Sequence, residues 1–141
     1  MRHKTSKAGL KVLLGLVALT TCWLVLAGPA QAAVTAEIAP KGKLLGAGES
    51  VQGVVTFSCS AGLQVVDATL AYQQGATDGV THIEGVVCDG RPHKYRVTVT
   101  ARAGSGTFSA GEAFAFAVLH AQDPQTGASE HIEVGATVRL R

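Results

Sequence analysis

The sequence contains none of the short motifs that identify the common classes of enzyme and cofactor-binding protein. It has no G-x-S-x-G elbow, no H-E-x-x-H helix, no glycine loop for phosphate and no aspartate-rich calcium loop. Ser109, His120 and Asp123 can be combined into a triad on paper, but a triad is a geometry and no local signature supports this one. We therefore expect a protein without enzymatic activity, catalytic residues, metal or cofactor.

Basic residues are scarce once the first part of the chain is set apart. Arg2, Lys4, Lys7 and Lys11 are four of the twelve basic residues, whereas all ten acidic residues follow residue 32. Residues 33–141 therefore hold eight basic residues against ten acidic ones, a net charge of −2. No cluster of Lys and Arg remains that could neutralise phosphates, so we expect no nucleic-acid partner.

The beginning of the chain has the pattern of an export signal. The basic segment is followed by an apolar run, residues 12–27, and then by a Gly-Pro pair and the small residues of PAQA. This run is short for a membrane span and ends at helix-breaking residues, which favours a cleaved signal over a retained anchor. We expect residues 1–32 to be a signal peptide cut after Ala32, and residues 33–141 to be a secreted domain with no membrane association.

The export signal also determines the interpretation of the three cysteines. Cys22 lies in the apolar run and leaves with the predicted signal peptide. Cys59 and Cys88 remain, without the C-x-x-C spacing of zinc or thioredoxin-like sites. Outside the reducing cytoplasm, such a pair forms a structural bridge by default. We expect one disulfide between Cys59 and Cys88, which stabilises the fold by roughly 3.5 kcal/mol in the chain-entropy model.

Helical periodicity is missing from residue 34 onward, and apolar residues alternate with polar ones instead. Segments rich in Gly, Pro and Asp, which form turns, lie between the alternating runs. This pattern is typical of an all-β fold, an Ig-like antiparallel β-sandwich of about seven strands. The predicted strands are residues 34–38, 51–59, 66–72, 83–87, 95–101, 114–118 and 132–140.

The sixth predicted strand alternates large apolar residues with alanine. Burial of phenylalanine contributes far more free energy than burial of alanine. We therefore expect one side of the strand to face the core and the other to face solvent. The expected inward residues are Phe114, Phe116 and Val118, and the expected outward residues are Ala113, Ala115 and Ala117. Across the following turn, the same register pairs His120 with Glu130 or a near neighbour.

Three short motifs resemble a group of small secreted proteins of actinomycete bacteria that are thought to be Ig-like. The motifs are Cys59 near the end of the second strand, the cluster Cys88-Asp89-Gly90-x-x-His93, and Gly106-Thr107-Phe108-x-x-Gly111. The resemblance spans residues 33–141 and implies a secreted Ig-like domain, but no activity, since none is assigned to that group. A weaker similarity is to the secreted Ig-like apoproteins that carry enediyne chromophores. Those proteins have two disulfides and this chain can form only one, which argues against chromophore binding.

The stretch THIEGVVCDGRPHKY, residues 81–95, concentrates residue types found in metal and hydrolase sites. Its DGRP segment is typical of a turn, and Cys88 is assigned to the disulfide. The triplet His-Ile-Glu occurs at 82–84 and again at 131–133, and in a strand its His and Glu share a face. Two ligands do not complete a metal site, and the fourth and seventh strands of an Ig-type sandwich are not neighbours. We expect the triplets on separate solvent-exposed surfaces.

The outward side of the third, sixth and seventh predicted strands carries small, weakly charged side chains, whereas a purely solvated face usually carries more charge. One interpretation is that alanine-rich coding filled a tolerant surface. The other is a flat contact surface that lets a partner approach the backbone closely. The candidate contact surface consists of Val65, Thr69, Ala71, Ala115, Ala117 and Thr137.

These observations favour a secreted, non-enzymatic binding module or a cell-envelope-associated module. We expect its partner to be another protein, an envelope polymer or a second copy of the chain. The alternative function is a small-molecule carrier with a cleft at one end of the sandwich. A carrier needs an apolar pocket, and the six Phe and Tyr side chains are mostly assigned to the predicted core.

Overall fold

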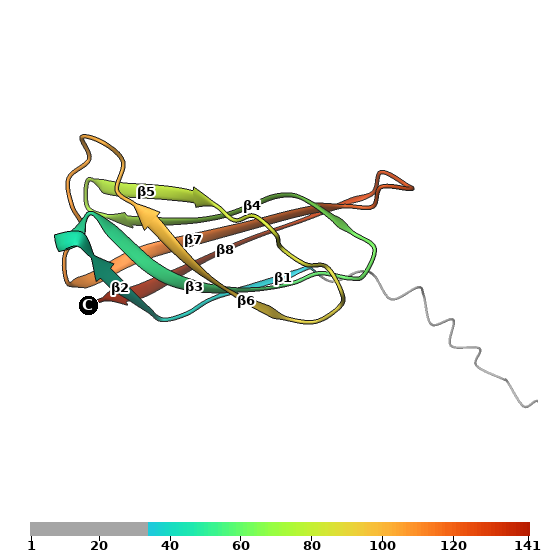
Figure 1. Cartoon of the computed structure of the whole chain (residues 1–141), viewed down its shortest axis with the longest axis horizontal. Helices are drawn as coiled ribbons and strands as arrows, with labels where there is room; N and C mark the ends of the chain where they lie inside the picture. The colour runs from blue at the N-terminus through green and yellow to red at the C-terminus, as the bar shows by residue number, and fades with distance from the viewer. Residues whose placement is uncertain (1–33) are drawn as a thin grey trace, which may run out of the picture. The chain divides into compact units, whose positions relative to one another are not determined.

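The computed structural model describes residues 34–141, which form an all-β unit without an α-helix (Figure 1). The predicted signal peptide, residues 1–32, lies outside the described residues. Within the described part of the chain, no helix is long and apolar enough to cross a membrane. The eight strands are β1 (Thr35–Ile38), β2 (Lys41–Leu45), β3 (Ser50–Ser58), β4 (Gln64–Gln74), β5 (Thr77–His82), β6 (His93–Thr100), β7 (Gly111–Gln122) and β8 (Ser129–Leu140). A short 3-10 turn, η1 (Gly46–Gly48), lies between β2 and β3.

The strands pair in two groups, and β2 joins these groups into one mixed eight-stranded sheet. In the first group, β3 pairs with β6 along one edge and with β1 and β2 along the other, all antiparallel. In the second group, β8, β7, β4 and β5 follow one another, again antiparallel. β2 also pairs in parallel with β8, through Lys41 and Gly42. The all-β prediction is confirmed, with eight strands instead of seven.

One hydrophobic core takes side chains from both groups of strands. Phe57 and Val55 enter it from β3, and Tyr72 and Leu70 from β4, all with at most 1% of their surface exposed. Successive residues of a strand point to opposite sides, so each strand contributes every second residue to this core. The remaining residues of β4, β5, β7 and β8 form an outward side, on which the candidate site lies.

Strand β2 falls in a segment that the sequence pattern assigned to a turn. Pro40 cannot donate a backbone hydrogen bond, and the chain leaves β3 near this point. The pairing register with β3 changes between Ile38, which faces Val55, and Lys43, which faces Gln52. The residues between Ile38 and Lys43 approach β8. A Cβ added at Gly42 would stand 2.8 Å from the side chain of Leu140.

The predicted fourth strand, residues 83–87, is wrong, because β5 covers Thr77–His82 instead. A tight turn at Gly75 sends the chain directly back along β4. The buried residues of β5 are Thr77 and Gly79, so the strand lacks the large apolar residues that mark an inward face. Glycine is needed at position 79, since an added Cβ would collide with the carbonyl oxygen of Thr100.

The orientation of β7 is the reverse of the prediction. Ala115 and Ala117 are fully buried, whereas Phe114 is 48% exposed. β7 lies between β4 and β8, which supply larger inward side chains such as Tyr72 and Leu140. Protein interiors are packed to the density of organic crystals, so small side chains on a central strand leave the volume that larger neighbours fill. We expected the side of β7 with the larger side chains to be buried. This expectation fails because the side chains of β4 and β8 already fill the core next to β7.

The predicted disulfide between Cys59 and Cys88 is confirmed. It joins the residue after β3 to the segment between β5 and β6, where the Gly90 amide donates to the Cys59 carbonyl oxygen at 2.9 Å. Asp89 Oδ1 lies 2.9 Å from both His93 Nε2 and the Arg91 amide. These hydrogen bonds, that of His93 first, hold the pKa of the Asp89 carboxyl below its usual value. Asp89 thus stabilises a turn, as the sequence pattern predicted.

Candidate contact surface and groove

The outward side of β5, β4, β7 and β8, here called the outer face, carries an apolar patch. Its centre is on β7, where Phe114, Phe116 and Val118 alternate with buried alanines. Phe116 lies opposite Ala71 of β4, and Ala71 in turn lies opposite Val80 of β5. Phe114 is 48% exposed and Val80 is 61% exposed. Large apolar side chains left exposed together on one face are typical of an interaction site.

Phe114 rests on a glycine of the neighbouring strand. Its register partner on β8 is Thr137, and its ring leans over Gly135, where an added Cβ would stand 2.5 Å from the ring Cζ. A glycine within a strand has no side chain to pack, and a cross-strand aromatic ring can cover the bare backbone. Strand β8 therefore positions the Phe114 ring, while about half of the side chain stays open to solvent.

The structure divides the residues of the predicted contact surface into two sets. Thr69, Ala71 and Thr137 lie on the outer face, and their role in contact stays a prediction. The outward orientation of Ala115 and Ala117 is wrong, because both side chains are fully buried. Val65 packs against the core instead of facing outward, because a bulge between Val65 and Asp67 shifts the register and leaves Val66 exposed.

A groove of about 490 Å³ lies on the outer face beside the apolar patch. Its apolar walls are formed by Ala71, Val80, Phe114 and Phe116, and its polar end by Gln73, Asp78 and Arg102. The polar end adjoins the turn between β4 and β5. The volume lies within the range of small-molecule sites, about 300–1,000 Å³. The groove is nevertheless open along the surface, so it can receive a side chain of a partner as well as a small molecule.

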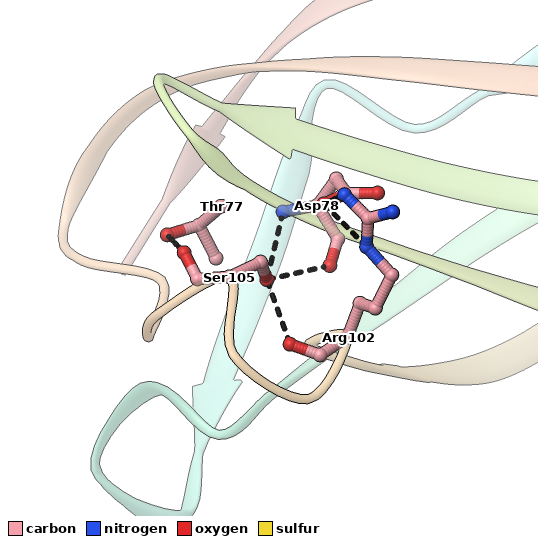
Figure 2. A network of polar contacts seen from close by, with 4 residues as sticks. All are labelled: Thr77, Asp78, Arg102 and Ser105. Atoms are coloured by element: carbon pink, nitrogen blue, oxygen red, sulfur yellow. Dashed lines mark hydrogen bonds and ion pairs between the residues drawn. The ribbon is translucent and has the colours of Figure 1, made fainter.

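The polar end of the groove is fixed by the hydrogen-bond network in Figure 2. Arg102 donates from Nε and Nη2 to Asp78 Oδ1, at 3.2 and 2.8 Å. Ser105 Oγ donates to the Arg102 carbonyl oxygen at 2.8 Å and accepts from the Asp78 amide at 3.3 Å, and Thr77 Oγ1 donates to the Ser105 carbonyl oxygen at 3.0 Å. The Arg102 side chain is 71% exposed, so the ion pair contributes little stability. The ion pair instead holds the loop after β6 close to the start of β5.

A row of histidines and carboxylates crosses another part of the outer face. His82 Nδ1 lies 3.1 Å from Asp67 Oδ1. His120 of β7 is the register partner of Asp67 on β4 and of His131 on β8. His131 Nε2 lies 2.9 Å from Glu133 Oε1. Both histidines are exposed and lie on strands that are not neighbours, as predicted, but they share the outer face, so the expectation of separate surfaces is wrong. Within residues 34–141, no three His, Cys, Asp or Glu side chains are grouped to hold a metal ion together.

The hydroxyl of Tyr72 is a buried polar atom without a hydrogen-bond partner in the described part of the chain. Tyr72 is 1% exposed and points inward from β4 toward Gly53 of β3, where an added Cβ would collide with the hydroxyl. Burial raises the pKa of Tyr72 above its ordinary value. The hydroxyl points away from the outer face, so we assign Tyr72 to core packing.

Of the residues that line the groove, only Ala71 was among the predicted site residues. Phe114 and Phe116 were assigned to the core, and Asp78 and Arg102 come together only through the loop that follows β6. The sequence does hold one signal for the exposed aromatic ring. Gly135 takes an outward position in the middle of β8, and a glycine inside a strand marks a site where another group approaches the backbone closely.

The comparisons with known proteins give a similarity of fold and no family. No protein-family model matches the chain, and no curated protein does. Among solved structures, the chain is similar to the crystal structure of a Bordetella pertussis protein provisionally assigned as ApaA. The two share 10% sequence identity with a TM-score of 0.52, over 77% of this chain and 94% of the other. At this identity, the similarity shows a common β-rich fold alone.

Proposed function

We propose that this protein is a secreted, non-enzymatic binding module with an Ig-like β-sandwich fold, and that it contacts a partner protein through its outer face. The observation that carries the proposal is the exposure of Phe114 and Val80 beside Phe116 on one side of a sheet. Exposed apolar surface costs about 25 cal/mol per Å² relative to burial. A partner that covers this patch recovers that free energy.

The pairing of the strands supports the Ig-like part of the proposal. Two groups of antiparallel strands contribute to one core. The N-terminal strand is divided, so that β1 pairs with β3 and β2 reaches across to β8. The similarity to a solved β-rich structure at a TM-score of 0.52 agrees with this arrangement. The resemblance of the motifs around Cys59 and Cys88 to small secreted actinomycete proteins points the same way.

The disulfide supports the secreted part of the proposal. Cys59 and Cys88 are bonded, and structural disulfides persist mainly outside the reducing cytoplasm. The pattern of residues 1–32 agrees with export, since a basic segment precedes an apolar run and a small-residue cleavage motif. Cleavage of the predicted signal removes four of the twelve basic residues and leaves residues 33–141 with a net charge of −2, which disfavours nucleic acid as the partner.

The distribution of residue types on the outer face favours a protein partner. Phe114, Phe116 and Val118 form an uncharged centre, and charges of both signs surround it. An apolar, aromatic centre with a polar rim is the usual composition of a protein–protein interface. The groove beside Phe114 is suited to an apolar side chain of the partner, and the exposed guanidinium of Arg102 at its end to a hydrogen-bond acceptor.

The groove also supports a second candidate function, that of a small-molecule carrier. Its volume of about 490 Å³ suffices for a small ligand, and two phenylalanines line it. Ligand sites of carriers normally bury about 70–90% of the ligand surface. A groove that is open along the surface of a sheet buries less, so contact with a protein is the favoured function.

Native mass spectrometry of the protein recovered from the medium of exporting cells tests the proposal. We expect a non-covalent complex with a mass increment of protein size, either a different chain or a second copy. An increment of a few hundred daltons supports the carrier instead, and a heterogeneous carbohydrate increment supports an envelope polymer. A protein that stays free of any increment under all conditions contradicts the proposed binding function.

A further inference from the structure

His120 and His131 form a close pair of imidazoles on the outer face. They are register partners on adjacent antiparallel strands, with ring centroids 5.8 Å apart and ring planes at 75°. The strands β7 and β8 are paired along their whole length, from Gly111 opposite Leu140 to Gln122 opposite Ser129. This long ladder fixes the two Cα atoms, so the imidazoles are held on one side of the sheet at short range.

We propose that His120 and His131 together bind one divalent transition-metal ion of the zinc, copper or nickel type. Imidazole is a preferred ligand of these ions. With metal–nitrogen bonds of about 2.0–2.1 Å, two imidazoles on one tetrahedral ion have ring centroids roughly 5 Å apart. The separation of 5.8 Å is close to this value, so the two rings are near enough to share one ion.

Glu133 is a positioning residue for this site. Its Oε1 lies 2.9 Å from His131 Nε2, so it accepts a hydrogen bond when that nitrogen carries the proton. The lone pair of His131 is then on Nδ1, which is the nitrogen available to the ion. A carboxylate on the far nitrogen of a ligating histidine fixes the ring and raises its basicity, as in many natural metal sites.

The proposed site is open and uses two ligands of the protein. The side chains of His131 and Glu133 are 50% and 55% exposed, so water fills the remaining coordination positions. No third ligand is grouped with the pair within the described residues, and binding is therefore weaker than at a closed four-ligand site. His82 takes no part, because it hydrogen-bonds to Asp67 and two strands separate it from His131. The site does not depend on the proposed contact function.

Calorimetric titration of the purified protein, carrying no polyhistidine tag, with zinc chloride tests this proposal. We expect one ion per chain. H120N and H131N each weaken binding at least tenfold, because each removes one of two ligands. E133Q weakens it by about tenfold through loss of ring orientation. H82N is the matched control, since it removes an exposed, carboxylate-bonded histidine from the same face, and it retains the affinity of the parent protein.

Imidazole nitrogen NMR locates the ion and separates loss of binding from loss of fold. Addition of zinc shifts the ring nitrogens of His120 and His131, and leaves those of His82 and His93 in place. The backbone spectra of H120N and H131N stay those of a folded protein. The proposal is overturned if either variant binds zinc as the parent does, if the shifts occur at His82 instead, or if millimolar zinc produces neither heat nor shifts.

Discussion

The ring of Phe114 covers the Cα of Gly135 on the neighbouring strand, at a distance that leaves no room for a Cβ on residue 135. The glycine and the exposed phenylalanine therefore depend on each other. Gly135 leaves the space in which the Phe114 ring lies on the outer face, and the ring covers the backbone of Gly135, which has no side chain of its own. An exposed aromatic side chain held in this way loses little conformational entropy when a partner covers it.

The contact between Phe114 and Gly135 predicts a ring-current effect. We expect the Hα protons of Gly135 to show an upfield NMR shift that disappears in F114L. In G135A the added methyl group displaces the ring, and the free energy of unfolding changes by less than about 1 kcal/mol because the ring can move into solvent. Hα shifts of Gly135 that are the same in the parent protein and in F114L would contradict the contact.

The two sides of β7 predict opposite responses to a charge. A115K places an unpaired ammonium in the core and is expected to cost more than about 4 kcal/mol, enough to prevent folding. F114K, one residue away, is expected to cost about 1 kcal/mol at most, because its side chain reaches solvent. Circular dichroism and urea unfolding of the two variants check this. If A115K folds and F114K does not, Phe114 is buried and Ala115 is exposed, which is the orientation that residue size alone predicts.

Loss of the disulfide predicts a large fall in stability. C59S removes the bridge to Cys88 and is expected to lower the free energy of unfolding by about 2–4 kcal/mol. C88S has the same effect, and the double variant adds little, because one bond is lost in each case. Urea unfolding gives the values. Free thiols labelled in the native secreted protein would show that the bridge is absent.

The buried hydroxyl of Tyr72 predicts a dependence of stability on alkaline pH. Its pKa is raised in the folded protein by burial, so the unfolded chain releases the proton more readily. The contribution of Tyr72 to the free energy of unfolding is therefore fully present below the ordinary tyrosine pKa of about 10. It falls as the pH rises above that value. Y72F lacks this contribution. It is also expected to be as stable as the parent at neutral pH or more so, because it removes a buried atom without a partner.

Urea unfolding of the parent and of Y72F at pH 7 and above pH 10 measures both effects. The difference in unfolding free energy between them should grow in favour of Y72F as the pH rises. A difference that stays constant, or a Y72F variant that loses more than about 1 kcal/mol at neutral pH, would indicate that the hydroxyl has a partner.

The sequence predicts the strand content and the disulfide because these depend on local signals. Alternating residues mark β3, β6 and β8 directly, and two cysteines allow one pairing. Strand β5 escapes detection, because Thr77 and Gly79 take its inward positions, and Gly79 lies directly against the backbone of Thr100 at the end of β6. Strand β2 escapes because five residues are divided between two partners, residues 43–45 with β3 and residues 41–42 with the distant β8.

The site is harder to predict, because it depends on which face of β7 is buried. Phe114 alternates with Ala113 and Ala115 in a pattern that is the same for either orientation. The volume of the inward side chains on β4 and β8 determines which face of β7 is buried. The sequence of β7 itself carries no information on that volume. The bulge near Val65 likewise changes the outward residues of β4 without a marker in the sequence.

The affinity of the protein for the chain recovered with it tests the central claim most directly. F114K introduces a charge at the centre of the outer face, and T98K introduces the same charge at an exposed position of β6, outside the outer face. We expect F114K to weaken binding about thirtyfold or more, the loss of at least about 2 kcal/mol that marks an interface hot spot, and T98K to bind like the parent. Equal affinities of F114K and the parent protein, with both folded, would contradict the account.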